Sequence, residues 1–435
     1  MCDILIKNAT IITMDNNMSI LKNMEISIYN GYIIAIKKKV NYNHKKIIDA
    51  KGCIVLPGLC NTHTHIGMTI LRGYAEDMPL HNWLYNKIWN IEKYFTPKTV
   101  YISSLLGCLE MIKFGTTSFC DMYFHMDSIK KAVLESGVRG YLSYGMIDNY
   151  NFEKGESEIK KTIEFIKSCK HDKNDRINVL LGPHSPNTCS IEFLSKIKEI
   201  SKEYNLKINI HLLETKMELD KFQNNYNQSP IKYLDSINFL DKNVLAAHCV
   251  WVSNEDMKLL SKNNVTISHN PISNMKLGSG IARIQKMMNY GINITLGTDS
   301  CASNNNLNLF EEIKITPLLQ KGMMKNSSLL HTQDVLKMVT SNVIKIFEDK
   351  IGMIKVGYRA DIIILDINKP HLQPYINNTN IYSLLVYSIN GYEVRDSIIN
   401  GKLVMENRNL ITINEDKVID KAKKELESIL NRIES

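Results

Sequence analysis

The chain lacks any hydrophobic run long enough to cross a membrane, because no apolar stretch approaches the roughly 18 residues that a spanning helix needs. Its start, MCDILIKNATIITMDNN, has an acid at position 3 and lacks the basic and continuously apolar regions of a signal peptide. The nine cysteines are scattered and contain no C-x-x-C pair, which is typical of reduced thiols and not of a disulfide framework. We therefore expect a cytoplasmic protein with no membrane partner.

Several catalytic and binding signatures are also missing. The sequence contains no H-E-x-x-H motif, no Gly-rich phosphate-binding loop, and no H-x-E with P-C-x-x-C as in cytidine deaminases. The formal net charge of +8 comes mostly from lysines spread along the chain, and no basic cluster is interleaved with aromatic residues. This pattern favours a solvated surface over a nucleic-acid partner.

Strand and helix patterns divide the 435 residues into three parts. Residues 1–58 show short β-branched runs with an Asn-Gly turn, and strand character returns over residues 346–435, which end in a helical pattern. Residues 59–345 alternate short apolar strands with helical stretches, as βαβ units do. We predict a barrel over residues 59–345, with the two flanking β segments joined into one side domain.

The stretch LPGLCNTHTHIG places His63 and His65 two residues apart, so both can lie on one face of a strand. Twelve histidines in 435 residues give about one-third of an H-x-H pair by chance, so the pair alone is weak evidence for a metal site. Its significance depends on whether other ligands occur at comparable places in the chain.

Later apolar strands do end in suitable groups. His211 and Glu214 follow one strand, His248 ends another and Asp299 follows a third. Taken singly, these residues could be a core histidine, a solvated acid or a helix N-cap. Together they favour a divalent metal site at one mouth of a parallel barrel, since imidazole and carboxylate are its usual ligands.

Several motifs, in the same order, resemble the amidohydrolase superfamily. They are LPGLCNTHTHIGMTILRGYAEDMPLHNWLYNKIWNIE, HLLET, AHCVW, SHNPISNMKLGSGIA, LGTDSCASNNNLNLFEE and GMIKVGYRADIIILD. Within the superfamily they are most similar to the 5-methylthioadenosine/S-adenosylhomocysteine deaminases and the 5'-deoxyadenosine deaminases. The resemblance covers nearly the whole chain, including both β flanks. It implies a (β/α)8 TIM barrel beside a composite β-sandwich made from both chain ends.

The same resemblance implies a site and an activity. One divalent ion would be held by His63, His65, His211 and Asp299; zinc is expected first, with iron, manganese and nickel as alternatives. Glu214 and His248 would lie around the metal-bound water, and Glu92 and His184 would contact a nucleoside. The implied reaction is hydrolysis of the 6-amino group of adenosine-type nucleosides, with release of ammonia. The oligomeric state stays open, a homo-oligomer included.

We hypothesise that Asp299 accepts the proton of the attacking water, Glu214 protonates N1 of the purine, and Asp299 then delivers a proton to the departing ammonia. His248 would orient the water and stabilise the tetrahedral oxygen. One position departs from the family pattern. Tyr144 stands where these deaminases usually carry an arginine for the amino-acid carboxylate of S-adenosylhomocysteine. A tyrosine cannot form a bidentate ion pair with a carboxylate. We therefore predict a preference for methylthioadenosine, 5'-deoxyadenosine or adenosine.

Two other functions remain open. The first is a guanine or other heterocycle deaminase, or a triazine hydrolase, of the same superfamily; the second is a scaffold that keeps the fold without a metal. Glu92 and His184 favour a nucleoside over the first, and the complete ligand set argues against the second. Trp83 could wall a purine pocket but is treated as a core residue. Six further histidines are given no role: His44, His81, His125, His171, His331 and His371.

Overall fold

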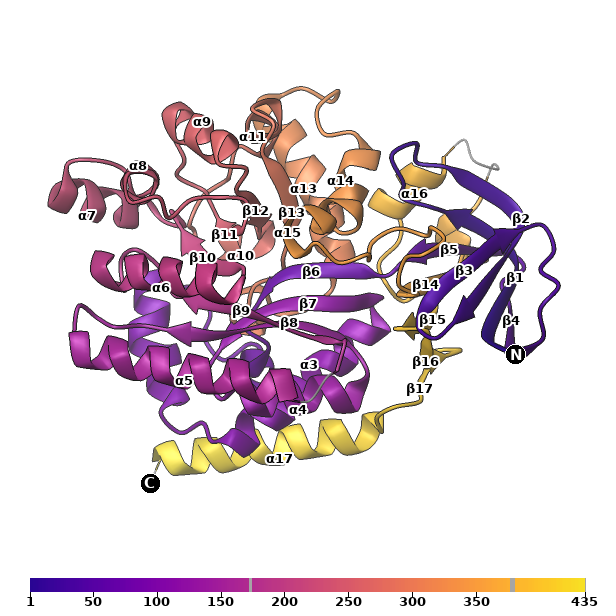
Figure 1. The fold of residues 1–435 in the computed structure, drawn as a ribbon, viewed down its shortest axis with the longest axis horizontal. Helices are drawn as coiled ribbons and strands as arrows, with labels where there is room; N and C mark the ends of the chain where they lie inside the picture. Colours follow the sequence, from indigo (N-terminus) through magenta and orange to yellow (C-terminus); the bar gives the residue numbers. More distant parts are fainter. Residues whose placement is uncertain (172–173, 376–379, 435) are drawn as a thin grey trace.

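A computed structural model describes residues 1–171, 174–375 and 380–434, which form two sheets. Eight parallel strands form a nearly closed barrel in which each strand pairs with the next along the chain (Figure 1). The strands are β6 (Leu59–Thr64), β7 (Thr116–Tyr123), β8 (Arg139–Met146), β9 (Ile177–Pro183), β10 (Ile208–Leu212), β11 (Val244–His248), β12 (Thr266–His269) and β13 (Asn293–Leu296). The predicted (β/α)8 barrel is confirmed.

Helices surround the barrel, and further short helices build the loops at its carboxyl end. Many begin at a Ser, Thr or Asn whose side chain accepts a backbone N–H, as Thr96, Ser190 and Thr215 do. The longer helices are α3 (Pro97–Lys113), α4 (Met126–Ser136), α5 (Phe152–His171), α6 (Ile191–Tyr204), α7 (Lys216–Tyr226), α9 (Asn254–Lys262) and α13 (Leu309–Met324). The shorter ones are η1 (Ile66–Leu71), α1 (Leu80–Trp83), η2 (Leu84–Ile88), α2 (Trp89–Glu92), α8 (Pro230–Ser236), α10 (Pro271–Lys276), α11 (Ile284–Asn289), α12 (Cys301–Asn304), α14 (Thr332–Met338), η3 (Ser341–Val343) and α15 (Ile344–Phe347). None of the described helices is long and apolar enough to cross a membrane.

The second sheet joins the two ends of the chain beside the barrel (Figure 1). It is one continuous mixed sheet, in which β14 pairs antiparallel with β5 and so links the N-terminal strands to the C-terminal ones. The N-terminal strands are β1 (Cys2–Ile12), β2 (Ile20–Tyr29), β3 (Tyr32–Lys37), β4 (His44–Asp49) and β5 (Cys53–Pro57). The C-terminal strands are β14 (Ile362–Asp366), β15 (Val394–Ile399), β16 (Lys402–Glu406) and β17 (Asn409–Leu410); η4 (Pro370–Leu372) and α16 (Ile381–Tyr387) lie between them along the chain.

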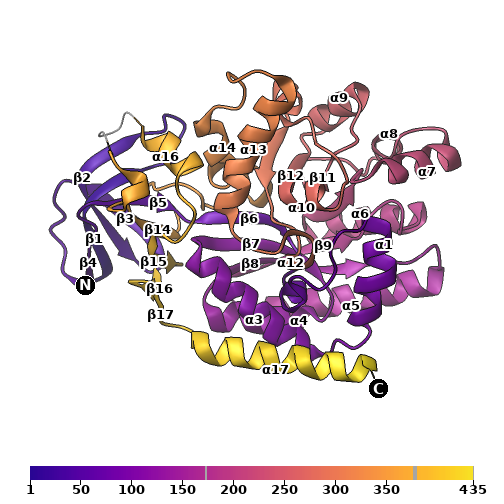
Figure 2. The same cartoon turned by 180° about the vertical axis from the view of Figure 1, so that it is seen from behind.

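The last helix, α17 (Glu415–Glu434), runs along the barrel helices α3 and α4 (Figures 1 and 2). Val418 packs with Leu105 and Leu109 of α3 in one buried cluster. At its start, the ammonium of Lys113 lies 2.6 Å from a carboxylate oxygen of Glu415. The C-terminal segment therefore contacts both the sheet and the barrel.

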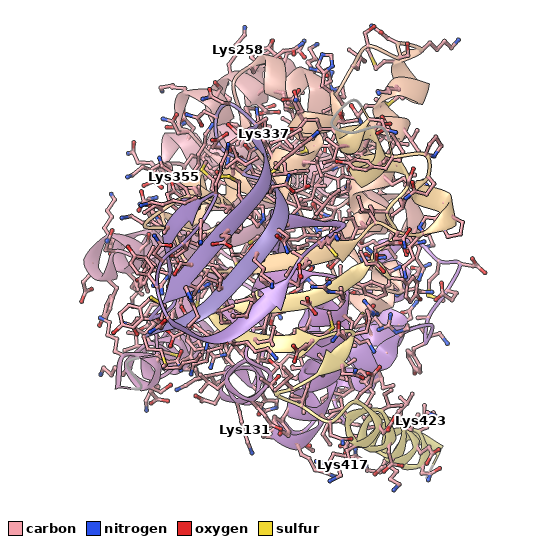
Figure 3. The ribbon with its side chains drawn as sticks, turned by 90° about the vertical axis from the view of Figure 1, so that its right-hand side faces the viewer. Lys131, Lys258, Lys337, Lys355, Lys417 and Lys423 are labelled. Atoms are coloured by element: carbon pink, nitrogen blue, oxygen red, sulfur yellow. The ribbon has the colours of Figure 1, made fainter. Side chains whose placement is uncertain are left out.

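Lysines from several parts of the chain contribute to the positive charge. Lys131, Lys258, Lys337, Lys355, Lys417 and Lys423 come from different parts of the chain and project from its periphery (Figure 3).

Side chains close the gap between the first and last barrel strands, a junction that we call the barrel seam. Thr62 Oγ1 donates to the carbonyl of Leu296 over 2.9 Å and lies 2.9 Å from Thr295 Oγ1. Asn61 Nδ2 donates to Thr298 Oγ1 over 2.7 Å. The backbone N–H of Asp299 then donates to the carbonyl of His63 over 2.9 Å. The seam therefore brings the residue after β13 beside the histidines of β6.

A buried ion pair fastens the opposite end of the barrel to the mixed sheet. Arg139, at the start of β8, is 0% exposed; its Nε donates to Asp361 Oδ2 over 2.9 Å and its Nη1 to the carbonyl of Asp175 over 2.7 Å. Asp361 lies directly before β14. The guanidinium of Arg139 therefore binds groups of this junction and not of the barrel mouth.

We expect Arg139→Met to lower the free energy of unfolding by about 3–5 kcal/mol, because it leaves the Asp361 carboxylate buried without its partner. Denaturant unfolding followed by tryptophan fluorescence measures the loss. The double variant Arg139→Met/Asp361→Asn should recover part of it, since no lone charge remains. An Arg139→Met protein as stable as the native one would show that the pair does not hold the junction.

Candidate metal centre and active site

Four histidines and one aspartate converge at the carboxyl end of the barrel. His63 lies in β6, His65 directly after it, His211 in β10, His248 at the end of β11, and Asp299 just after β13. Two overlapping sets have their ligand atoms within 4.8 Å of one another: His63, His65 and Asp299, and His63, His211 and His248. The strand ends that the sequence singled out therefore meet at one point.

The hydrogen bonds of His65 and His211 leave two lone pairs facing each other. His65 Nδ1 lies 2.6 Å from the carbonyl oxygen of Met122, and His211 Nδ1 lies 2.8 Å from that of His184. A carbonyl only accepts, so each Nδ1 carries the proton, and each Nε2 of the neutral ring carries a lone pair. These two Nε2 atoms are 3.1 Å apart. Without a cation between them, the contact is repulsive.

His63 gives a second indication of a cation. Its side chain is 0% exposed, and neither ring nitrogen has a hydrogen-bond partner among the described residues. Burial, helped by the neighbouring His65, lowers the pKa of His63 well below its ordinary value, so the ring stays neutral. An unpartnered buried polar group costs about 1–3 kcal/mol. The residues present therefore fit a divalent cation held by imidazole and carboxylate.

Asp299 supplies the carboxylate of this cluster. Its Oδ1 lies 3.3 Å from His65 Nε2 and 3.7 Å from His63 Nε2. Burial acts to raise the pKa of Asp299, but the positive charge that the neighbouring histidine rings carry when they are protonated lowers it to about 2. The hydroxyl of Ser273 donates to Oδ2 over 2.6 Å. Asp299 is thus held as a carboxylate with one oxygen toward the histidines.

Glu214 lies beside the cluster, and its surroundings favour the protonated carboxyl group. Its Oε2 is 3.7 Å from His248 Nε2, and its Oε1 accepts from Ser279 Oγ over 3.2 Å. Burial first, and then the charge of Asp299, raise the pKa of Glu214 to about 8. Two carboxyl groups with pKa values pushed apart are typical of an acid and base pair.

The backbone turns sharply where these side chains leave their strands. Leu213, His248, Cys249 and Asp299 have φ angles of 50°, 71°, 49° and 62°, in the left-handed region that non-glycine residues seldom adopt. Such residues cluster at functional sites because the surrounding structure must hold them there. At these positions the bends end the strands next to the cluster.

A cavity of about 300 Å³ opens from the cluster and is lined mainly by apolar side chains. Its wall includes Trp83, Trp89, Met122, Phe124 and Leu277. This volume lies at the lower end of the range of small-molecule sites, which are mostly apolar with a few placed polar groups. The indole of Trp83, left out of the site on sequence grounds, is part of this wall.

Two polar residues proposed from the sequence also line the cavity, Glu92 and His184. Glu92 comes from α2 and accepts a short hydrogen bond from the hydroxyl of Tyr123. Burial raises the pKa of Glu92 to about 7 and lowers that of His184 to about 4. His184 Nδ1 lies 2.9 Å from Thr188 Oγ1. Both groups are thus oriented by a hydroxyl.

Tyr144 does not line the cavity, although Gly145 and Ile147 of the same segment do. Successive residues of β8 point to opposite faces, so Tyr144 turns outward, where burial raises its pKa and Glu158 and Lys161 of α5 are its charged neighbours. Tyr144 therefore lies outside the cavity, and the preference for substrates without a charged tail stays a prediction.

Several residues that line the cavity were not predicted from the sequence. His81, given no role, lies in α1, and Met217, Glu218 and Lys221 lie in α7. Glu218 and Lys221 are three residues apart, so they lie one turn apart on the same face of α7. This spacing is the one feature of the sequence that could have indicated them. The path of the loops over the barrel mouth decides the rest.

Comparisons with known proteins agree with this architecture. The amidohydrolase family model matches residues 54–404. The chain is 47% identical over 432 residues to a 5'-deoxyadenosine deaminase of Methanosarcina acetivorans, covering 99% of each. It is 45% identical over 402 residues to a 5-methylthioadenosine/S-adenosylhomocysteine deaminase of Thermococcus sibiricus, covering 92% of this chain and 94% of the relative.

Among solved structures, a zinc-bound adenosine deaminase of Xanthomonas campestris superposes with a TM-score of 0.93 at 26% identity, covering 99% of each chain. The family model spans both the barrel strands and β14 to β15 of the mixed sheet, well over half of the sequence. On the match of sequence, fold and strand-end chemistry, the chain belongs to the amidohydrolase family.

Proposed function

We propose that this protein is a cytoplasmic, metal-dependent deaminase that hydrolyses the 6-amino group of adenosine-type nucleosides and releases ammonia. The observation that supports it most is the pair of facing lone pairs on His65 and His211, 3.1 Å apart beside Asp299 and at the end of an apolar cavity. The relatives named as deaminases of 5'-deoxyadenosine and of methylthioadenosine supply the substrate class.

The proposed ligands are His63, His65, His211 and Asp299, with zinc as the ion. A divalent metal there would lower the pKa of a bound water toward about 7 and so supply a nucleophile at neutral pH. The remaining chemistry belongs to the protein. Asp299 accepts the proton of the attacking water, and Glu214 donates a proton to N1 as the water adds to C6. Asp299 then delivers its proton to the departing amino group, which leaves as ammonia. A carboxyl with a pKa of about 8 is suited to that donation.

Glu92 and His184 bind the nucleoside. A carboxylate can accept from the two ribose hydroxyls at once, and Tyr123 orients Glu92 by donating to it. Trp83 and Trp89 offer apolar faces to the purine. The cavity thus offers Glu92 and His184 for the ribose and aromatic side chains for the purine, which favours a nucleoside over a free base.

The cavity disfavours a charged 5'-tail. Among the described residues that line it, Lys221 is the one lysine or arginine, and its side chain is exposed. Glu92, Glu214, Glu218 and Asp299 bring four carboxyl groups to the same cavity. A substrate carboxylate would therefore lack a buried cationic partner, so 5'-deoxyadenosine and methylthioadenosine are the proposed substrates.

Removal of the metal should abolish activity. Dialysis against a chelator is expected to reduce ammonia release from 5'-deoxyadenosine at least 100-fold, and one equivalent of zinc should restore it. Metal content is measured in parallel by mass spectrometry. His65→Ala should bind less metal, since it removes one of the facing lone pairs, while the exposed His331→Ala is the matched control. Full activity in a metal-free preparation would contradict the proposed mechanism.

Glu214→Gln should keep its metal and lose turnover. Removal of a general acid costs about 10²–10⁴-fold in rate, so we expect kcat to fall by at least 100-fold with metal content unchanged. Glu203→Gln, on the exposed face of α6, is the matched control and should behave as the native protein. A Glu214→Gln enzyme with near-native kcat would exclude Glu214 as the proton donor.

The substrate preference is tested with a panel of adenosine, methylthioadenosine, 5'-deoxyadenosine, S-adenosylhomocysteine and guanine. We expect kcat/KM for 5'-deoxyadenosine and methylthioadenosine to exceed that for S-adenosylhomocysteine at least tenfold. Lys221→Met should lower only the value for S-adenosylhomocysteine. If that substrate or guanine had the highest kcat/KM, the proposed preference would be wrong.

A further inference from the structure

One segment contacts three different site residues from outside. It comprises α10 and the loop after it, residues 271–279, and we call it the α10 segment. Ser273 donates to Asp299 and Ser279 donates to Glu214, as described above. Between them, Asn274 Oδ1 lies 2.8 Å from His248 Nδ1. The motif SHNPISNMKLGSG therefore reaches every acid and base of the proposed mechanism, although no role has been given to it.

Asn274 is held firmly within this segment. It is 1% exposed, its backbone N–H donates to the carbonyl of Asn270 over 3.0 Å, and its own carbonyl accepts from the N–H of Ser279 over 2.8 Å. Its side-chain nitrogen has no partner among the described residues. The contact with His248 is thus the one hydrogen bond that the structure gives to this buried amide, and it is made by the oxygen.

This contact selects one tautomer of His248. An amide oxygen only accepts, so Nδ1 of His248 carries the proton. Asn270 agrees: its amide is satisfied when its nitrogen donates to the carbonyls of Gly297 and His269, each 3.2 Å away, which places its oxygen 3.4 Å from the same Nδ1. Both neighbours therefore present acceptors to Nδ1. The other nitrogen, Nε2, is left with a lone pair on the cavity side, where Glu214 lies.

We propose that Asn274 is a positioning residue that fixes His248 in the tautomer protonated at Nδ1, so that Nε2 accepts a hydrogen bond from the attacking water. This inference rests on the proposed function and adds a direction to it. In this arrangement His248 accepts a hydrogen bond from an O–H of the water and donates none to it. A lone pair aimed at the water's O–H turns the oxygen lone pair toward C6 of the purine, which is the geometry that attack requires.

Two substitutions separate the acceptor from mere packing. Asn274→Leu keeps the volume and removes the acceptor; Asn274→Asp keeps an acceptor oxygen and replaces the unpartnered nitrogen. We expect Asn274→Leu to lower kcat for 5'-deoxyadenosine about 10–100-fold, the usual effect of losing such an outer partner, with KM changed less than twofold. Asn274→Asp should keep kcat within about threefold of native. Asn289→Leu, in the exposed part of α11, is the matched control.

Opposite outcomes would overturn the proposal. If Asn274→Leu kept its kcat, the contact would have no part in turnover. If Asn274→Asp were worse than Asn274→Leu while both variants kept native stability and metal content, an acceptor oxygen at this position would not be what His248 needs, and the positioning role would be refuted. A loss of kcat matched by an equal loss of bound metal would place the effect in the metal site and not in His248.

A spectroscopic measurement tests the tautomer without activity. In protein labelled with ¹⁵N-histidine, the native His248 ring should show a protonated Nδ1 and an unprotonated Nε2, and Asn274→Leu should lose that fixed pattern. This readout is independent of the substrate. A native protein with the predicted tautomer but no ammonia release from any nucleoside would contradict the proposed function alone, whereas a native ring protonated at Nε2 would contradict the inference.

Discussion

The contact on which the site depends is a repulsive one. Two imidazole nitrogens, each with a lone pair, are held 3.1 Å apart by carbonyl oxygens that fix their protons on the far side of the rings. His63, buried and unpartnered, adds a third uncompensated group. A protein tolerates such an arrangement only when a cation occupies the space between the two nitrogen lone pairs. The rest of the barrel mouth is arranged around that requirement.

The outer hydrogen bonds come from the fold and not from added elements. Met122 closes the neighbouring strand β7, His184 follows β9, and the α10 segment follows β12. Met122, His184 and Asn274 each lie next to the strand whose histidine they hold, whereas Ser279 reaches one strand further, to Glu214 after β10. In a parallel barrel, neighbouring strand ends lie side by side, so one loop can orient the ligand of the next strand while contributing a substrate contact of its own. His184 does both.

The sequence predicted the parts that depend on strand ends alone. His63, His65, His211, His248 and Asp299 were found because each follows an apolar run, and parallel strands bring such positions together. The direction in which Tyr144 points could not be predicted, because β8 is buried on both faces and no alternation reveals which of its residues turn inward. The wall from α1 and α7 could not be predicted either, since it depends on the path of long loops in space.

The pairing of β5 with β14 has a consequence for the chain as it leaves the ribosome. About 300 residues separate these strands, so β5 stays an unpaired edge while the whole barrel is synthesised. Contacts of such long range form late and leave apolar strands open to other chains in the interval. The protein would thus be most vulnerable to aggregation not as a finished enzyme but as a nearly complete nascent chain, awaiting its last hundred residues and, with them, helix α17.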